Sequence, residues 1–163
     1  MLLFLKNALF TVIVPGTVAV LVPFRILSRR SYSFELRGPL QYLALLLLLL
    51  GTAVYLRCVW DFAVTGRGTP APIDAPKVLV VRGLYRYVRN PMYVGVLLVV
   101  LGWSALFGSS ALLIYAGSVG LFFHLFVVVV EEPILRRKFG ESYEQYCSSV
   151  RRWLPGRSYE RAT

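Results

Sequence analysis

Two long apolar runs constrain this chain more than any other feature of its sequence. Residues 2–24 and residues 40–60 are each long enough to form an α-helix of the roughly 20 apolar residues that cross a bilayer. The mean hydropathy of +0.65 and the 57% content of hydrophobic residues lie far above the values of a water-soluble domain. At 163 residues the chain has room for one domain. The sequence therefore predicts a single all-α integral membrane domain.

Two further apolar segments predict a helical hairpin in the second half of the chain. Residues 92–107 are short for a full span, and residues 111–130 are long enough for one. Gly108, Ser109 and Ser110 interrupt the pattern between them, as expected for a tight turn. Together with the two N-terminal runs, the hairpin gives about four transmembrane helices.

Polar segments divide the chain around these helices. Glycines and prolines between residues 65 and 76 forbid a continuous helix and predict a loop. After residue 131, apolar and aromatic residues at helical spacing predict short amphipathic helices at the interface, with Gly140 as a break. The expected parts of the single membrane domain (1–163) are two N-terminal spans (1–64), a Gly/Pro loop with an arginine-rich motif (65–91), the hairpin (92–130), and interfacial helices with a tail (131–163).

The net charge of +10 fits a membrane protein better than a nucleic-acid-binding one. The basic residues lie beside apolar runs and are not gathered on a polar domain, so we expect no nucleic-acid partner. Four spans would place both termini and the 60–90 loop on one side, where most basic residues collect, and the positive-inside rule makes that side cytoplasmic. Four arginines in the first loop oppose this orientation, namely Arg25, Arg29, Arg30 and Arg37.

The cysteines and glycines exclude several kinds of site. Cys58 lies in an apolar helix and Cys147 in the polar tail, so we interpret both as free thiols and predict no metal site. The glycine-rich strand-to-helix turn by which soluble α/β enzymes bind nucleotide cofactors is missing from the sequence. Any cofactor site must therefore be built from helix ends and interfacial side chains.

An arginine-rich motif leads directly into the third apolar segment. If this stretch is partly helical, Arg82, Arg86 and Arg89 share a face. Such guanidinium groups either clamp a carboxylate or phosphate or anchor the chain to lipid headgroups, and the residues alone leave both open. Asn90 and Pro91 are suited to be the N-cap and first residue of the next helix.

A pair of carboxylates ends the fourth apolar segment. Glu131 and Glu132 follow four valines directly, and a charge at that depth is costly unless it is paired or has a function. The pair either reaches out to water or binds the ammonium of an amino-acid-like cofactor. His124 lies two turns earlier on roughly the same face, and we interpret it as a packed or helix-bonded histidine in preference to a catalytic base.

Together these segments resemble the superfamily of isoprenylcysteine carboxyl methyltransferases and phospholipid methyltransferases, which are membrane enzymes. The resemblance covers residues 68–155, and the chain is similar to the bacterial members of the superfamily. It consists of the motifs Gly83-x-Tyr85-x-x-x-Arg89-x-Pro91-x-Tyr93 and Glu131-Glu132-x-x-Leu135-x-x-x-Phe139-Gly140-x-x-Tyr143-x-x-Tyr146, which flank the hairpin, and a terminal Arg152 and Pro155.

The resemblance implies the cofactor and the site. It implies that S-adenosyl-L-methionine is the cofactor and that six residues surround it, namely Tyr85, Arg89, Asn90, Tyr93, Glu131 and Glu132. It places Arg137 towards the substrate, so Glu131 and Arg137 are the expected catalytic residues. Eukaryotic members usually have histidine at the position of Asn90; asparagine keeps a hydrogen bond there but cannot titrate, so it is not a general base.

The acceptor of the methyl group stays open at this stage. The expected partners are a lipophilic or lipid substrate and the bilayer, in a bacterial inner membrane with the active site on the cytoplasmic side. A prenylcysteine carboxylate, a phospholipid amine, a small thiol and a phenol are all compatible with the sequence. Two more distant alternatives are a relative of the NADPH-dependent membrane reductases and a non-enzymatic membrane protein in which the glutamate pair binds an ion.

Overall fold

The computed structural model describes residues 9, 11–29, 38–66, 79–156 and 158–159. In this part of the chain the regular structure is helical, apart from an isolated bridge between Val88 and Arg151, so the predicted all-α class is confirmed. The elements are η1 (Thr17–Leu21), α2 (Val22–Ser28), α3 (Pro39–Asp61), η2 (Phe62–Gly66), η4 (Gly83–Arg86), α4 (Pro91–Phe107), α5 (Ser110–Phe126), η5 (Val127–Glu131), α6 (Glu132–Phe139) and α7 (Glu141–Ser149). The predicted loop was expected to begin at residue 65, but η2 continues through Gly66, so its first two residues are helical. Residues 67–76 lie outside the described residues.

Three described helical stretches are long and apolar enough to cross a membrane. They are Thr11–Ser28, Pro39–Val64 and Ser110–Phe139. The fourth apolar helix, α4, has 17 residues and falls short of that length. The structure therefore supports an integral membrane protein with three candidate spans.

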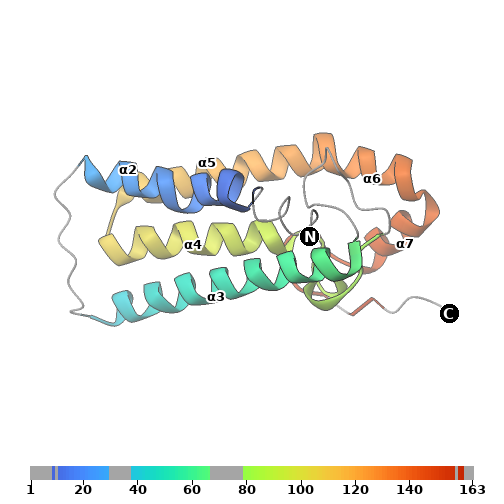
Figure 1. Ribbon diagram of the computed structural model, residues 1–163, viewed down its shortest axis with the longest axis horizontal. Coiled ribbons are helices and arrows are strands. Elements are labelled where there is room, and N and C mark those ends of the chain that lie inside the picture. Colours follow the sequence, from blue (N-terminus) through green and yellow to red (C-terminus); the bar gives the residue numbers. More distant parts are fainter. Residues whose placement is uncertain (1–8, 10, 30–37, 67–78, 157, 160–163) are drawn as a thin grey trace.

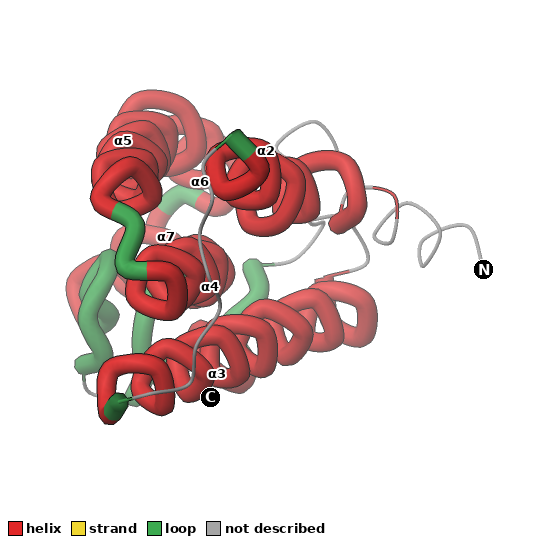
Figure 2. Tube along the Cα trace, turned by 90° about the vertical axis from the view of Figure 1, so that its left-hand side faces the viewer, coloured by secondary structure: helices red, strands yellow, loops and turns green. Residues whose placement is uncertain are grey.

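The long helices run along the long axis of the molecule (Figure 1). Seen end-on, α4 lies in the middle, with α3 on one side and α2 and α5 on the other (Figure 2). The end of α2, the start of α3 and the turn between α4 and α5 lie at one end of the bundle, called here the turn end (Figure 1). The 3-10 helix η4 and helices α6 and α7 lie at the opposite end, called here the motif end.

The predicted hairpin forms between α4 and α5. Gly108 ends α4 in the left-handed conformation (φ 58°), and its N–H donates to the Ser104 carbonyl. Ser109 then caps α5, because its hydroxyl accepts a hydrogen bond from the Leu112 N–H at 3.3 Å. Glycine is the usual residue for such a left-handed helix end, so the sequence located this turn correctly.

Small residues bring the backbones of α3 and α4 into contact. A Cβ atom added to Gly51 would lie 2.6 Å from the Gly95 carbonyl oxygen, and one added to Gly95 would lie 2.9 Å from the Gly51 carbonyl oxygen. Further along, a Cβ on Gly102 would lie 3.1 Å from the Ala44 carbonyl oxygen. Lipid provides no hydrophobic drive between helices, so close packing of this kind is what holds membrane helices together.

Adding one methyl group to this contact should therefore destabilise the fold. We expect Gly51→Ala to lower the free energy of unfolding in detergent by about 1–3 kcal/mol, since backbone atoms cannot move aside. Gly117→Ala is the matched control, because its added Cβ meets nothing within 4 Å and alanine favours helix by about 1 kcal/mol over glycine. Equal effects of both substitutions on the unfolding temperature would contradict the proposed packing.

Proline shapes the first helix and creates its ties to the bundle. Pro23 has no N–H to give to the Ala19 carbonyl, and the Val22 N–H donates to Thr17 across the π-helical segment η1. The freed carbonyls are used by neighbouring helices: Trp103 Nε1 donates to Ala19 at 3.0 Å, and the Tyr115 hydroxyl donates to Val18 at 3.0 Å. In lipid, such bonds are what makes a proline-broken helix tolerable.

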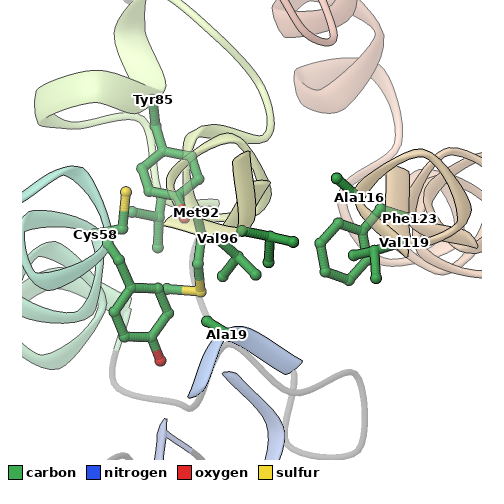
Figure 3. Close-up of a cluster of buried hydrophobic side chains, with 11 residues drawn as sticks. Ala19, Cys58, Tyr85, Met92, Val96, Ala116, Val119 and Phe123 are labelled. Atoms are coloured by element: carbon green, nitrogen blue, oxygen red, sulfur yellow. The ribbon is translucent and has the colours of Figure 1, made fainter. Parts of the chain in front are cut away.

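A buried cluster joins these helices and reaches the motif end. Ala19, Cys58, Met92, Val96 and Phe123 belong to it, and they come from η1, α3, α4 and α5 (Figure 3). Tyr85 of η4 belongs to the same cluster, so the arginine-rich motif is anchored directly in the hydrophobic core. The site at the motif end is thus held by the same side chains that hold the bundle.

Candidate active site

The arginine-rich motif does not form the single helical face that its spacing suggested. Its only helical turn is η4, and Arg82 is exposed. The Arg86 Nε donates to the Tyr159 carbonyl at 3.3 Å, and Arg89 points elsewhere, towards Cys147 and Glu132. The condition for a shared three-arginine face is therefore not met, because regular helix ends at Arg86 and resumes only at Pro91.

Gly83 sets the start of this motif against a buried carboxylate. Its φ of 56° is a conformation that favours glycine, and a Cβ atom there would collide with the carboxylate of Asp61. Asp61 ends α3, is almost fully buried, and pairs with Arg57 at 3.3 Å. Asp61 has no functional signal in the sequence, because its neighbours indicate only the end of an apolar span.

The C-terminal residues 151–156, called here the strap, run beside the motif. The Arg89 N–H donates to the Arg151 carbonyl at 2.9 Å, and the Gly156 N–H donates to the Tyr87 carbonyl at 2.9 Å. Asn90 precedes α4 as predicted, but its side chain makes no helix cap. Its Nδ2 instead donates to the Arg152 carbonyl at 3.2 Å. The motif and the strap therefore form one unit.

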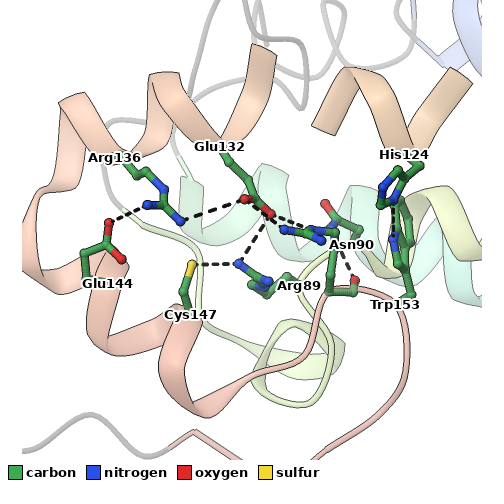
Figure 4. Close-up of polar contacts among 9 residues, drawn as sticks. Arg89, Asn90, His124, Glu132, Arg136, Glu144, Cys147 and Trp153 are labelled. Carbon is green, nitrogen blue, oxygen red and sulfur yellow. Dashed lines mark hydrogen bonds and ion pairs between the residues drawn. The ribbon is translucent and has the colours of Figure 1, made fainter. Parts of the chain in front are cut away.

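Glu132 is the centre of a buried cluster of charges (Figure 4). Its carboxylate accepts hydrogen bonds from Arg152 Nε at 2.7 Å and Arg152 Nη2 at 3.1 Å, and Arg89 Nη1 lies at 3.4 Å. Arg136 Nη2 lies at 4.0 Å and also pairs with Glu144 at 3.1 Å. The hydrogen bonds from Arg152 to this carboxylate raise the pKa of Arg152 above its usual value. Arg89 therefore meets Glu132, one of the two glutamates.

One N–H donor of Arg89 has no hydrogen-bond partner within this cluster. Its side chain is only 12% exposed, and Nη1 donates to the sulfur of Cys147 at 2.7 Å. Among the described residues, Arg89 Nε is the buried side-chain nitrogen or oxygen that has no hydrogen-bond partner. A buried donor left unpaired costs about 1–3 kcal/mol, so this atom is a candidate donor to a bound ligand.

Glu131 faces α4 and takes no part in the arginine cluster. Its Oε1 accepts a hydrogen bond from the Tyr93 hydroxyl, and the ring of Tyr93 packs on Phe123 with a centroid distance of 4.5 Å. Neighbouring residues on a helix point about 100° apart, which explains why the two glutamates have different partners. The arrangement places a carboxylate and a phenol next to the Arg89 cluster.

Buried tyrosines support the arginine-rich motif through a hydrogen bond and a ring contact. The Tyr146 hydroxyl of α7 donates to the Tyr85 carbonyl at 2.6 Å, and the Tyr85 ring packs edge-on against Phe62. Burial raises the pKa of Tyr85, Tyr143 and Tyr146 above the usual tyrosine value. Tyr85 was predicted to contact a cofactor, and the structure places its side chain in the hydrophobic core.

The raised tyrosine pKa values predict alkaline unfolding. A buried phenol that stays neutral in the folded state stabilises the protein below its ordinary pKa of about 10, and this stability is lost as the pH rises further. We expect Tyr146→Phe to cost about 1–3 kcal/mol at pH 7, since the Tyr85 carbonyl loses its donor, and to reduce the loss of stability above pH 10. Unfolding curves that stay parallel for both proteins from pH 8 to 11 would refute this.

Two other residues from the sequence analysis lie outside the Glu132 cluster. Arg137 is exposed on α6, and among the described residues no ion-pair partner is found for it. His124 is exposed, not packed, and its Nδ1 accepts a hydrogen bond from Trp153 Nε1 at 3.2 Å (Figure 4). Its partner comes from the strap and not from its own helix, so the interpretation as a packed or helix-bonded histidine was wrong.

Two residues of the cluster were missed as site residues. Arg152 was noted only as part of the terminal motif, and Cys147 only as a free thiol. Both contact the centre of the cluster, through Glu132 and Arg89. Arg152 carried a weak signal, an arginine within an alternating polar and aromatic tail, but the strap that brings it back to Glu132 is a tertiary feature.

Known proteins match this chain over the segments that build the site. The family described as Phospholipid methyltransferase matches residues 40–142. A protein-S-isoprenylcysteine O-methyltransferase of Schizosaccharomyces pombe is 37% identical over 78 residues, which cover 48% of this chain and 33% of the yeast protein. An uncharacterized protein of Haemophilus influenzae is 36% identical over 63 residues, 39% of this chain and its own entire length.

The chain thus spans about a third of the fission yeast enzyme that it matches. No solved structure matches it significantly. The family match covers the arginine-rich motif, the hairpin and the glutamate pair, and so includes Arg89, Glu132 and Arg136 of the cluster, but it ends before Cys147 and Arg152. The chain belongs to the phospholipid methyltransferase family of membrane methyltransferases, the superfamily that also includes the isoprenylcysteine O-methyltransferases.

Proposed function

We propose that this protein transfers a methyl group from S-adenosyl-L-methionine to a lipophilic acceptor at the membrane interface. The observation that carries the proposal is the unpaired, buried Nε of Arg89, whose Nη1 lies 3.4 Å from Glu132, the chain neighbour of the Tyr93-bonded Glu131. A zwitterionic amino-acid group needs a cation and an anion side by side, and this cluster offers both. The match to a methyltransferase family supports the same choice.

The residues present fit the amino-acid part of this cofactor. Arg89 has a spare donor for the cofactor carboxylate, and charge-assisted hydrogen bonds of this type are the strong ones. Glu131 would hold the ammonium group, since its partner is a neutral phenol and not an arginine. Tyr93 and Asn90 flank these two residues at the start of α4.

Glu132 has a different task in this proposal. Its two oxygens already accept two hydrogen bonds from Arg152 and face Arg89. Glu132 is therefore a positioning residue, which holds Arg89 and the strap in place, and it contributes to the cofactor site through them.

When bound, the cofactor supplies a methyl group on a sulfonium, and the transfer is an in-line displacement. The main work of the protein is then to align the acceptor and keep water out. Buried side chains at the motif end serve this purpose: Tyr143 and Tyr146 of α7 pack with Leu135 and Phe139 of α6.

Two acceptor classes are favoured by the comparisons. The fission yeast relative is named for an isoprenylcysteine, whose carboxylate is already ionised and needs no base. The family is described by phospholipids, and a phospholipid amine must first lose a proton, for which Glu131 is the candidate base. In both cases Arg137, exposed on α6, would orient the acceptor. A small thiol or a phenol is an alternative acceptor.

The proposed topology has four spans and the active site at the cytoplasmic face of a bacterial inner membrane. Helix α4 would be the span that is added to the three candidate spans. The bilayer would thin locally to match the length of its 17 residues. Charge supports the orientation. The described basic residues at the motif end outnumber Arg25 and Arg29 at the turn end; they are Arg57, Arg82, Arg86, Arg89, Arg136, Arg137, Lys138, Arg151 and Arg152.

The test is a methyl-transfer assay with purified protein in lipid nanodiscs. Labelled S-adenosylmethionine is offered with an N-acetylated, S-farnesylated cysteine in one arm and phosphatidylethanolamine in another. We expect label in one of these lipids and binding of S-adenosylhomocysteine by calorimetry. Binding of NADPH in place of S-adenosylhomocysteine would favour a reductase, and binding of neither would refute the proposed function.

A further inference from the structure

The single histidine of this chain lies on the apolar surface near the site. His124 is exposed on the helical stretch Ser110–Phe139, where a polar side chain is costly unless it has a function. Its Nδ1 lies 3.2 Å from Trp153 Nε1. An indole N–H can only donate, so Nδ1 must be the acceptor, and the neutral ring carries its proton on Nε2.

The strap ties this histidine to the charge cluster. Trp153 follows Arg152, whose side chain holds Glu132 at 2.7 Å and whose carbonyl accepts a hydrogen bond from Asn90 at 3.2 Å. Trp153 also packs against the buried core cluster. Figure 4 shows His124 and Trp153 beside Asn90, on the side away from Glu144. The position of the imidazole is therefore set by the same residues that set the cofactor site.

His124 lies deeper in the apolar zone than the glutamates. It precedes Glu131 by seven residues, about 10 Å along a helix, in the direction of the turn end. Among the described residues no hydrogen-bond partner of His124 Nε2 is found. The surface next to the site therefore presents one N–H donor in apolar surroundings, where water does not compete for it and a hydrogen bond gains strength.

We propose that His124 Nε2 donates a hydrogen bond to an oxygen of the lipophilic acceptor, an ester or amide carbonyl that lies below its nucleophile. Trp153 is the positioning residue, because its N–H fixes the tautomer that makes Nε2 a donor. This inference rests on the proposed function and names the acceptor class, an amphiphile with a carbonyl oxygen on the bilayer side of its reactive end.

The test separates acceptor binding from cofactor binding. Steady-state kinetics are measured in nanodiscs with the S-farnesylated N-acetylcysteine and with phosphatidylethanolamine, next to calorimetry with S-adenosylhomocysteine. We expect H124L to raise the KM for the acceptor about three- to tenfold, the range of one hydrogen bond, with kcat and S-adenosylhomocysteine affinity unchanged. W153F should raise the same KM, and H124Q should regain part of the loss because its amide keeps both a donor and an acceptor.

Matched variants and probes keep the outcomes distinct. Ile114, 72% exposed on the same helix, provides the control I114A, which should leave the KM unchanged. A diether phosphatidylethanolamine, which lacks the carbonyls, should lose the difference between wild type and H124L. Equal KM values for wild type and H124L would overturn this inference alone, as would turnover of neither lipid by a protein that binds S-adenosylhomocysteine. Absence of that binding in the wild type would refute the proposed function instead.

Discussion

Replacing Arg89 with alanine should lower kcat/KM for methyl transfer by at least about 100-fold, the loss of roughly 3 kcal/mol from charge-assisted hydrogen bonds. The cofactor carboxylate would lose its cation, since the other arginines near Glu132 are already engaged. The fold should survive, because Glu132 keeps the paired hydrogen bonds from Arg152. The measurements are turnover of labelled S-adenosylmethionine and the unfolding temperature of the same preparation.

Arg89→Lys separates charge from geometry in this prediction. Lysine keeps the positive charge but has no equivalent of the Nε donor, so we expect it to recover only a minor part of the activity. Glu131→Gln should also abolish transfer without affecting membrane insertion. Wild-type turnover in Arg89→Ala and Glu131→Gln would remove the basis of the proposed site.

The largest effect on stability is expected from Glu132→Gln. This change leaves Arg89 and Arg152 near a neutral amide, with no anion to balance two charges that lie largely out of water, while Arg136 keeps its pair with Glu144. Breaking a buried ion pair from one side costs about 3–5 kcal/mol. We expect a protein that inserts poorly or unfolds at a clearly lower temperature in detergent.

Glu144→Gln is the control for this second prediction. Its pair with Arg136 is 3.1 Å long, but both side chains are at least half exposed, so its loss should cost less than about 1 kcal/mol. Adding Arg152→Gln to Glu132→Gln should restore part of the stability, because it removes one unbalanced charge. Equal unfolding temperatures for Glu132→Gln and Glu144→Gln would show that Glu132 does not organise the motif end.

Local chemistry explains which parts of the fold the sequence could predict. The second and fourth apolar runs and the turn at Gly108 are set by composition and by one residue's backbone preference, so they were located closely. The first helix continues to Ser28, beyond the predicted end at residue 24, and its predicted start lies outside the described residues. The contact between Gly51 and Gly95 could not be predicted, because a glycine within a run of leucines gives no sign of its partner. Composition also could not determine the number of spans, because α4 is apolar but short for a full span.

The same distinction applies to the candidate site. The sequence placed Arg89 and the glutamates at the same end of the bundle, where apolar segments begin or end, and the structure brings Arg89 to Glu132. It did not predict that Glu131 and Glu132 have different partners, or that Arg152 holds Glu132. Those contacts depend on the strap folding back along the motif, and no local pattern in residues 151–156 specifies its path.

The central claim, that Arg89 binds the carboxylate of the methyl donor, is tested most directly by calorimetry with two ligands. S-adenosylhomocysteine carries the carboxylate, and 5′-methylthioadenosine lacks the whole amino-acid end. We predict that Arg89→Ala weakens the binding of S-adenosylhomocysteine on the order of 100-fold and leaves the affinity for 5′-methylthioadenosine unchanged. The reason is that the substitution in the protein and the truncation of the ligand remove the same interaction. An equal loss of affinity for both ligands, or no loss for either, would contradict the claim.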